Sequence, residues 1–310
     1  GDEAKARVTR DFRADDISDR PFGWNLPNRL IRRELVAALS DLQRVDFRPG
    51  TATRTLFTRT GEARVGLSDG SRLRTRLVVA ADGRDSPMRR AAGIGVRTTR
   101  YGQSALAFAV THPEPHGNVS TEIHRSGGPF TLVPLLDHDG RHSSAVVWLE
   151  DGPRARDLAQ TADAGFEAEM TARSCGILGP LTLASRRTVW PIISQRAEHM
   201  TGERLALMAE AAHVMPPIGA QGLNTSMADL AALLDLAEAR PDTLGDAAML
   251  SEYARRRESD VRTRIAGIDL LNRASRSGVR PVQDARAAGI AALHGVGPVR
   301  TGLMRLGLGA

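Results

Sequence analysis

The chain has 310 residues, of which 41% are hydrophobic and 25% charged, close to the averages for globular proteins. A chain of this length can bury roughly 75% of its unfolded surface, so we expect a compact core. The single cysteine, Cys175, excludes an internal disulfide and a cysteine-based metal site, and it fits the reducing cytoplasm. Apolar runs such as 77–81 and 231–234 are far shorter than the roughly 20 residues of a membrane-spanning helix.

The net charge of +6 comes almost wholly from arginine, since Lys5 is the only lysine. A basic surface can meet nucleic acid, an acidic protein or anionic lipid. The arginines are scattered along the chain and aromatic residues make up only 4%, which leaves little for stacking bases. We therefore expect no nucleic-acid partner, and of these partners we favour peripheral contact with a membrane.

The first hundred residues predict strands around one helix. Residues 1–27 alternate charged with apolar positions and end in a turn, which indicates strands. Asn28 is a suitable N-cap for a helix whose apolar residues recur at helical spacing up to Leu39. Short alternating segments over 45–79, with a turn at 68–71, predict a β-meander. The apolar run 76–81 predicts a strand buried on both faces.

The rest of the chain predicts a second sheet and then helices. Segments 105–111, 119–124, 130–136 and 144–149 read as strands of an antiparallel sheet, separated by Pro, Gly and Asp-Gly turns. Residues 153–176 are predicted helical, 184–194 and 204–208 are strands, and 222–239 is a long apolar helix ended by Pro241. The remainder, to residue 308, is predicted helical with glycine breaks.

Two strand–turn–helix units carry the residues of chemical interest, because helix N-termini with free N–H groups bind anions in α/β folds. The first spans 78–90, where Gly83 permits a tight turn, Ser86 can cap the helix and Pro87 suits its first turn. An ordinary crossover turn would explain this unit alone.

The second unit spans 204–224 and joins a strand, a Pro-Pro turn, a glycine-containing loop and a helix start. So many special residues between one strand and one helix favour a backbone cradle for a ligand. Its helix amides at Gly222, Leu223 and Asn224 would then face an electron-rich group.

Together, these units resemble the flavin-dependent aromatic hydroxylases, the family of p-hydroxybenzoate hydroxylase, in the branch that acts in ubiquinone biosynthesis. The first unit is similar to the family's Asp-Gly motif, and the second to its Gly-Asp motif followed by Ala-Ala-His, Pro-Pro and Gly-Gln-Gly-Leu-Asn. The segment 22–28 also resembles the ubiquinone branch. The resemblance implies that FAD and NAD(P)H contact these residues: Asn28, Arg29, Asp82, Gly83, Ser86, Arg89, Glu210, Gly219, Gln221, Gly222, Leu223 and Asn224.

The resemblance gives each segment a role. Asp82, Gly83, Ser86 and Arg89 would approach the FAD pyrophosphate and the nicotinamide, and Glu210 the ribityl chain. Pro216 and Pro217 would lie beside the flavin, with the amides of 222–224 at its N1/O2 edge and Asn28 or Arg29 near the cofactor. No residue is assigned as a catalytic acid or base.

The implied fold is α/β (mixed α+β): an incomplete Rossmann-like FAD domain interleaved with an antiparallel substrate domain and a C-terminal helical region. The substrate-domain strands are expected at 1–27 and 101–198, FAD-domain parts at 28–100 and 199–240, and C-terminal helices at 241–310.

The sequence departs from the family pattern in two places. Ala209-Glu210 replaces Gly-Asp, which keeps the carboxylate but adds a methylene. Family members also begin with a Gly-x-Gly-x-x-Gly loop for the ADP half of FAD, and no such motif occurs in these 310 residues.

The function implied is an NAD(P)H- and O2-dependent oxidoreductase that hydroxylates an aromatic ring, with a polyprenylated phenol as substrate. Lifting such a substrate from an anionic bilayer would suit a basic protein that is cytoplasmic and peripheral to the inner membrane face. The alternative is a relative that binds no FAD and serves assembly with other quinone-biosynthesis proteins. A third interpretation, that the chain is a piece of an ordinary enzyme, is favoured over that alternative.

Two histidine pairs have a spacing that could suggest a metal, His112 with His116 and His138 with His142. Pro113 and Pro115 exclude a helix between the first pair, and Asp139-Gly140 predicts a turn in the second. We therefore expect surface histidines and no metal site. Cys175 is expected to be a buried or half-buried thiol with no chemical role.

Overall fold

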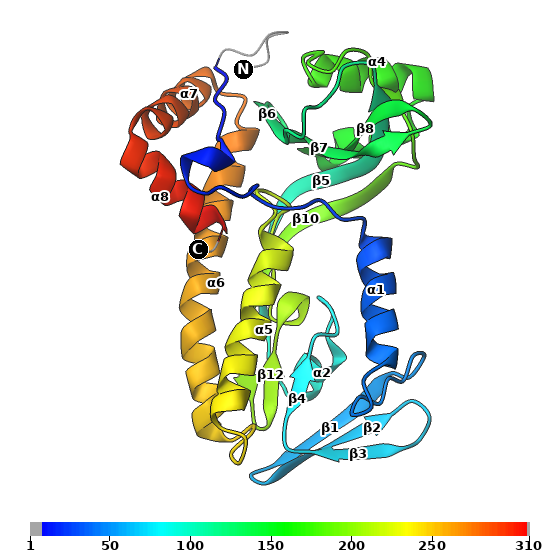
Figure 1. The fold of residues 1–310 in the computed structure, drawn as a ribbon, viewed down its shortest axis with the longest axis vertical. Helices are drawn as coiled ribbons and strands as arrows, with labels where there is room; N and C mark the ends of the chain where they lie inside the picture. The colour runs from blue at the N-terminus through cyan, green and yellow to red at the C-terminus, as the bar shows by residue number, and fades with distance from the viewer. Residues whose placement is uncertain (1–7, 309–310) are drawn as a thin grey trace. The chain divides into compact units, whose positions relative to one another are not determined.

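A computed structural model of the chain describes residues 8–308 (Figure 1). The chain divides into two compact units, each with its own hydrophobic core. The first unit contains the residues through Asn25, Arg100–Ile192 and those from Asp269 onward; the second contains Leu26–Thr99 and Ile193–Ile268. The assignment of the expected segments to FAD and substrate roles stays a prediction. The expected C-terminal region 241–310 is divided between the two units at residue 268.

The second unit is built on two small sheets. Strands β1 (Thr53–Arg59), β2 (Glu62–Leu67) and β3 (Arg72–Thr75) form the antiparallel meander predicted over 45–79. Strand β4 (Val78–Ala80) pairs in parallel with β12 (Leu205–Leu207), which pairs in turn with β11 (Thr201–Gly202). A short strand, β13 (His213–Val214), pairs with the end of β10 (Thr188–Ala197).

Helices complete the second unit: α1 (Asn28–Ser40), α2 (Pro87–Ala91), the 3-10 helix η2 (Ala209–Ala211), α5 (Gln221–Ala239) and the first part of α6 (Ala247–Arg276). Figure 1 shows α5 running alongside that part of α6. Leu233 and Leu236 of α5 and Tyr253 of α6 are buried in one core with the apolar strand β12. The Tyr253 hydroxyl donates a hydrogen bond of 2.9 Å to the carbonyl of Leu207, which fixes α6 against the end of β12.

The first unit carries the predicted antiparallel sheet, in the order β5 (Val96–His112), β8 (Arg141–Asp151), β7 (Gly128–His138) and β6 (Thr121–Arg125), with β9 (Thr182–Leu183) also on β5. Helices α3 (Gly152–Gln160) and α4 (Asp163–Arg173) replace the single helix expected over 153–176, since the chain turns extended at Thr161. Both bury apolar residues against the sheet. Helices α7 (Arg280–Gly295) and α8 (Gly297–Leu308) follow.

The strands expected over 1–27 are wrong for the described residues 8–27, which form only the short 3-10 helix η1 (Ala14–Asp16) and irregular chain. Alternation indicates residues that can share a face, but a strand also needs a partner for its backbone. Here the Asp11 carbonyl accepts from the His294 ring, and the Phe12 ring packs edge-on against that ring at 5.5 Å. Side chains of α7 therefore hold this segment in place of a neighbouring strand.

Helix α1 is confirmed, but its cap is not. The N-cap is Pro27, whose carbonyl accepts from the amides of Leu30 and Ile31, and Asn28 is the first helical residue. No residue of α1 is buried.

Strand β4 also differs from the prediction. It was expected to be buried on both faces, yet Val79 is 43% exposed. In the part of the chain that the structure describes, β4 is the edge of its sheet and pairs only with β12. Burial on both faces requires a strand on each side, which an apolar run alone does not establish.

Candidate functional site

Both predicted units begin at neighbouring strand ends. Strands β4 and β12 are parallel, with Leu207 opposite Ala80, and the Met208 amide donates to the Ala80 carbonyl at 3.0 Å. The loops that follow them therefore leave the same edge of the sheet. Ligands of α/β folds bind at the carboxyl ends of parallel strands, so this edge is where a site is expected.

The first loop forms the predicted tight turn. Gly83 has a φ of +86°, a backbone conformation that disfavours any side chain. Ser86 caps α2 as predicted, because its Oγ accepts from the Arg89 amide at 2.9 Å. The exposed Asp82 carboxylate accepts from the Met88 amide at 3.0 Å. Acidic and hydroxyl groups thus satisfy the first amides of α2.

Arg89 is buried, with 4% of its surface exposed. Its guanidinium donates to the Ala211 carbonyl at 2.7 Å and to the Arg84 carbonyl at 2.9 Å. Burial lowers the pKa of Arg89, and neighbouring Arg90 lowers it further. The resemblance implies a cofactor contact for Arg89, but in this structure its guanidinium ties the first loop to the second.

Glu210 lies on η2, directly after β12, and its side chain is half exposed. Its two carboxylate oxygens accept from Arg84 at 3.2 and 3.3 Å. Both side chains are more than one-third exposed, so the pair contributes only about 0.2–1 kcal/mol and can exchange for another partner. Sequence reasoning missed Arg84, and no local signal could have identified a contact across 126 residues.

The second loop leads to an uncapped helix N-terminus. Gly219 and Ala220 have φ values of +66° and +53°, and Ala220 gives α5 no side-chain cap. Pro216 is buried and Pro217 exposed, and Gly222, Leu223 and Asn224 are all exposed in the first turn. The side-chain amide of Gln221 donates to the Gly219 carbonyl, and that of Asn224 donates to the Ala220 carbonyl. The N-cap residue Ala220 therefore offers no side-chain acceptor to the backbone amides of Gly222 and Leu223.

A buried cluster of charges lies beneath this edge. Asp229 on α5 is fully buried, and its Oδ2 accepts from the His213 ring at 2.7 Å and from the Ala209 amide at 3.0 Å. Its Oδ1 accepts from Arg257 on α6 at 2.7 Å. Burial alone would raise the pKa of Asp229, but the hydrogen bonds and charges of His213 and Arg257 hold it below its ordinary value. Asp229 is therefore ionised at neutral pH.

Two of the predicted residues are not joined to this edge. Asn28 and Arg29 are exposed in the first turn of α1, and among residues 8–308 neither forms a hydrogen bond or an ion pair with the two loops. Their predicted place near the cofactor stays a prediction.

Of the four histidines expected at the surface, His138 is exposed, His116 and His142 are partly buried, and His112 differs from the expectation. His112 is fully buried; its ring nitrogens bond the Glu114 carbonyl at 2.8 Å and the Ser144 hydroxyl at 2.9 Å. The rings of His116 and His142 lie 6.1 and 6.3 Å from it. His142 is placed there by the pairing of β5 with β8, which sets it opposite His112. Within the described part of the chain no group of three His, Cys, Asp or Glu is placed to hold a metal. Cys175 is partly buried, as expected.

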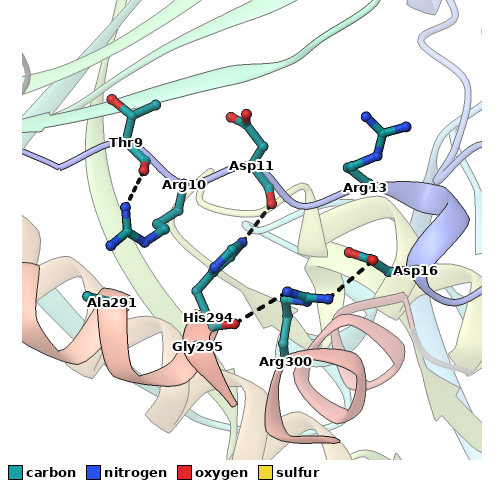
Figure 2. Close-up of a pocket in the computed structure, with 9 residues that line it drawn as sticks. All are labelled: Thr9, Arg10, Asp11, Arg13, Asp16, Ala291, His294, Gly295 and Arg300. Atoms are coloured by element: carbon teal, nitrogen blue, oxygen red, sulfur yellow. Dashed lines mark hydrogen bonds and ion pairs between the residues drawn. The ribbon is translucent and has the colours of Figure 1, made fainter. Parts of the chain in front are cut away.

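A cavity of about 550 Å³ lies in the first unit (Figure 2). It is lined by Thr9, Arg10, Asp11, Arg13, Asp16, Ala291, His294, Gly295 and Arg300, and it includes no predicted site residue. Figure 2 shows Arg300 directed toward Asp16, at 3.2 Å. His294 likewise donates to the Asp11 carbonyl. These contacts attach residues 9–16 to α7 and α8, which accounts for the charges around the cavity.

The donor set of the sheet edge fits the ribityl and isoalloxazine end of FAD. Helix amides without a side-chain cap suit the electron-rich N1/O2 edge of a flavin, and a carboxylate held by a weak ion pair suits a sugar-like hydroxyl. The described helices include none that is both long and apolar enough to cross a membrane.

Comparison with known proteins identifies the family. The family model described as FAD binding domain matches residues 20–265. Ubiquinone hydroxylase UbiL of Rhodospirillum rubrum is 34% identical over 292 residues, which cover 93% of this chain and 67% of that protein. The 3-demethoxyubiquinol 3-hydroxylase of Escherichia coli is 26% identical and covers 96% and 76%, respectively.

Solved structures show the same fold. The p-nitrophenol 4-monooxygenase PnpA of Pseudomonas putida superimposes with a TM-score of 0.72 at 18% identity, over 90% of this chain and 71% of that one. Anhydrotetracycline hydroxylase OxyS of Streptomyces rimosus gives 0.69 at 19% identity, and this chain spans 56% of its length. The predicted mixed α/β fold class and the resemblance are confirmed. The chain belongs to the FAD binding domain family, the flavin-dependent aromatic hydroxylases, which are oxidoreductases with FAD as their cofactor.

Proposed function

We propose that the chain is the FAD- and NAD(P)H-dependent part of a monooxygenase that hydroxylates the ring of a polyprenylated phenol in ubiquinone biosynthesis. The observation that carries the proposal is the first turn of α5. Its exposed residues 222–224 follow an N-cap without a side-chain acceptor, and the loop before it carries Glu210 and leaves the same sheet edge as the Asp82 loop. The names of the ubiquinone hydroxylases at 26–34% identity support the substrate class.

When bound, FAD reduced by NAD(P)H would supply the activation of O2 and the transfer of one oxygen atom to the ring. The residues of this chain bind and orient it. The α5 amides would hold the N1/O2 edge, where the helix dipole stabilises negative charge. Glu210 would exchange Arg84 for a ribityl hydroxyl, and Asp82 and Gly83 would lie by the pyrophosphate. Pro216 and Pro217 would border the ring.

The basic composition supports a place at the membrane surface. A polyprenylated substrate partitions into the bilayer, and a chain with a net charge of +6 is attracted to anionic lipid. We infer a cytoplasmic protein in peripheral contact with the inner membrane face. Binding to vesicles of anionic lipid that weakens with added salt is the expected result, and equal binding to neutral vesicles would contradict it.

The test of the function starts with FAD itself. The chain is mixed with excess FAD, desalted, and measured by visible absorption. Retained flavin bands are expected, followed by O2-dependent consumption of NAD(P)H and a product one oxygen heavier when a prenylated phenol is added. A colourless protein would reject the proposal and favour the FAD-free role in assembly with other quinone-biosynthesis proteins.

A matched pair of variants tests Glu210. Glu210→Ala should weaken the retention of FAD about tenfold, since one hydrogen bond that its carboxylate accepts from a ribityl hydroxyl is lost. Glu203→Ala, an exposed carboxylate on the turn between β11 and β12, should leave retention unchanged. Equal retention by both variants would remove Glu210 from the cofactor site.

A further inference from the structure

The buried charges beneath the sheet edge have an arrangement that stability alone does not require. The side chains of Asp229 and His213 are 0% and 2% exposed, and that of Arg257 is 7% exposed. Burying ion pairs costs desolvation, and apolar residues of similar volume often stabilise a protein equally well. We therefore look for the function of this buried cluster in the backbone segments that its hydrogen bonds hold in place.

At one end of the network, Asp229 binds residues that precede and follow Glu210 in the chain. The Asp229 carboxylate binds the amide of Ala209, directly before Glu210, and the ring of His213, three residues after it. Ala209 has a φ of +53°, which is strained for a residue with a Cβ. The hydrogen bond to its amide therefore fixes a turn that would otherwise relax, and with it the direction in which Glu210 leaves the backbone.

The other end reaches the first turn of α5. Arg257 donates from Nη2 to the Thr225 carbonyl at 3.3 Å and from Nη1 to Asp260 at 2.8 Å. The second oxygen of Asp260 accepts from Arg264 at 2.9 Å, and Arg264 donates to the Gln221 side chain at 2.6 Å. An unbroken series of hydrogen bonds and ion pairs thus runs from the Ala209 amide before Glu210, through Asp229 and along α6, to Gln221, the first residue of α5.

We propose that Asp229, Arg257 and Arg264 are positioning residues for the flavin site: they fix the Glu210 turn and the first-turn amides of α5 at a set separation. The inference rests on the proposed function, because those are the two features assigned to the ribityl chain and the N1/O2 edge. The low pKa of Asp229, held down by His213 and Arg257 against its burial, keeps the central carboxylate charged.

The test uses the outermost cation of the network. Arg264 is 18% exposed, so Arg264→Met removes its bonds to Asp260 and Gln221 while leaving the deepest pair intact. Arg262→Met, exposed on the same helix, removes the same charge and serves as the control. Amide hydrogen exchange is measured without FAD, and the dissociation constant for FAD is measured by quenching of flavin fluorescence.

For Arg264→Met we expect faster exchange at the amides of 221–225 and a dissociation constant for FAD raised about tenfold, with the thermal midpoint close to that of the control. Arg264→Lys should restore part of the affinity, because a cation returns to Asp260. Unchanged exchange and affinity in Arg264→Met would overturn the inference and leave the proposed function standing. A wild-type chain that takes up no FAD would overturn the proposed function and the positioning role with it.

A second variant separates position from stability. Asp229→Asn keeps the volume but leaves Arg257 without its central anion. Faster exchange over 209–213 and weaker FAD binding, measured at a temperature where the variant is folded, support the proposal. Lower stability with an unchanged dissociation constant would show a structural role alone and refute it.

Discussion

The clearest quantitative prediction concerns Arg89, whose guanidinium joins the two loops. Arg89→Met keeps most of the apolar stem but removes two hydrogen bonds, one to the buried Ala211 carbonyl and one to the partly buried Arg84 carbonyl. A hydrogen bond from a charged donor contributes about 1.5–3 kcal/mol, and acceptors left unpaired add to the loss. Relief of the buried charge, whose Nε has no partner in the described structure, offsets part of it. We expect a net loss of about 3 kcal/mol in the free energy of unfolding.

Urea denaturation followed by circular dichroism measures this loss, with Arg90→Met as the control. Arg90 is the next residue and is exposed, so its replacement should change stability by less than about 0.5 kcal/mol. Two variants of equal stability would refute the reasoning. Weaker FAD binding by Arg89→Met at wild-type stability would instead assign Arg89 to the cofactor, as the resemblance implies.

Two further predictions test the backbone and the buried histidine. Ala209→Gly should raise the free energy of unfolding by about 0.5–1 kcal/mol, because glycine adopts the φ of +53° without the cost of a Cβ; a loss of stability in urea would contradict this. Burial lowers the pKa of His112, so its contribution to stability is present above about pH 6.5 and is lost as the pH falls through the lower folded value. The decline in stability from pH 7 to pH 5 should therefore be shallower in His112→Gln than in the wild type or in His138→Gln, an exposed control, and equal slopes in all three would contradict the assignment.

Local patterns predicted those parts of the fold that local interactions determine. The meander β1–β3, the sheet of β5 to β8 and helix α5 all follow from alternation or helical periodicity with clear turns. The two loops were also identified locally, because glycine, proline and capping residues act within a few positions. The burial of His112 was not predictable in this way, since it depends on pairing with a strand 30 residues away.

The failures share one physical cause. Alternation predicts strands over 1–27, and the apolar run 76–81 predicts a strand covered on both faces, because periodicity reports which side chains can share a face. It does not report whether another strand is present to pair with. In the described structure His294 meets the Asp11 carbonyl, and β4 pairs only with β12. Contacts across a hundred or more residues decide these cases, as they decide the partner of Glu210.

The two departures of the second loop from the family motif can now be considered together. Alanine in place of glycine strains residue 209, but Asp229 holds its amide. Glutamate in place of aspartate extends the carboxylate by one methylene, and Arg84 from the first loop meets it at 3.2 Å. Because that ion pair is exposed and weak, it keeps Glu210 in place without preventing its exchange for a ligand. Each change therefore has a compensating contact, which supports the proposed binding role of this loop with Ala209 and Glu210 in these positions.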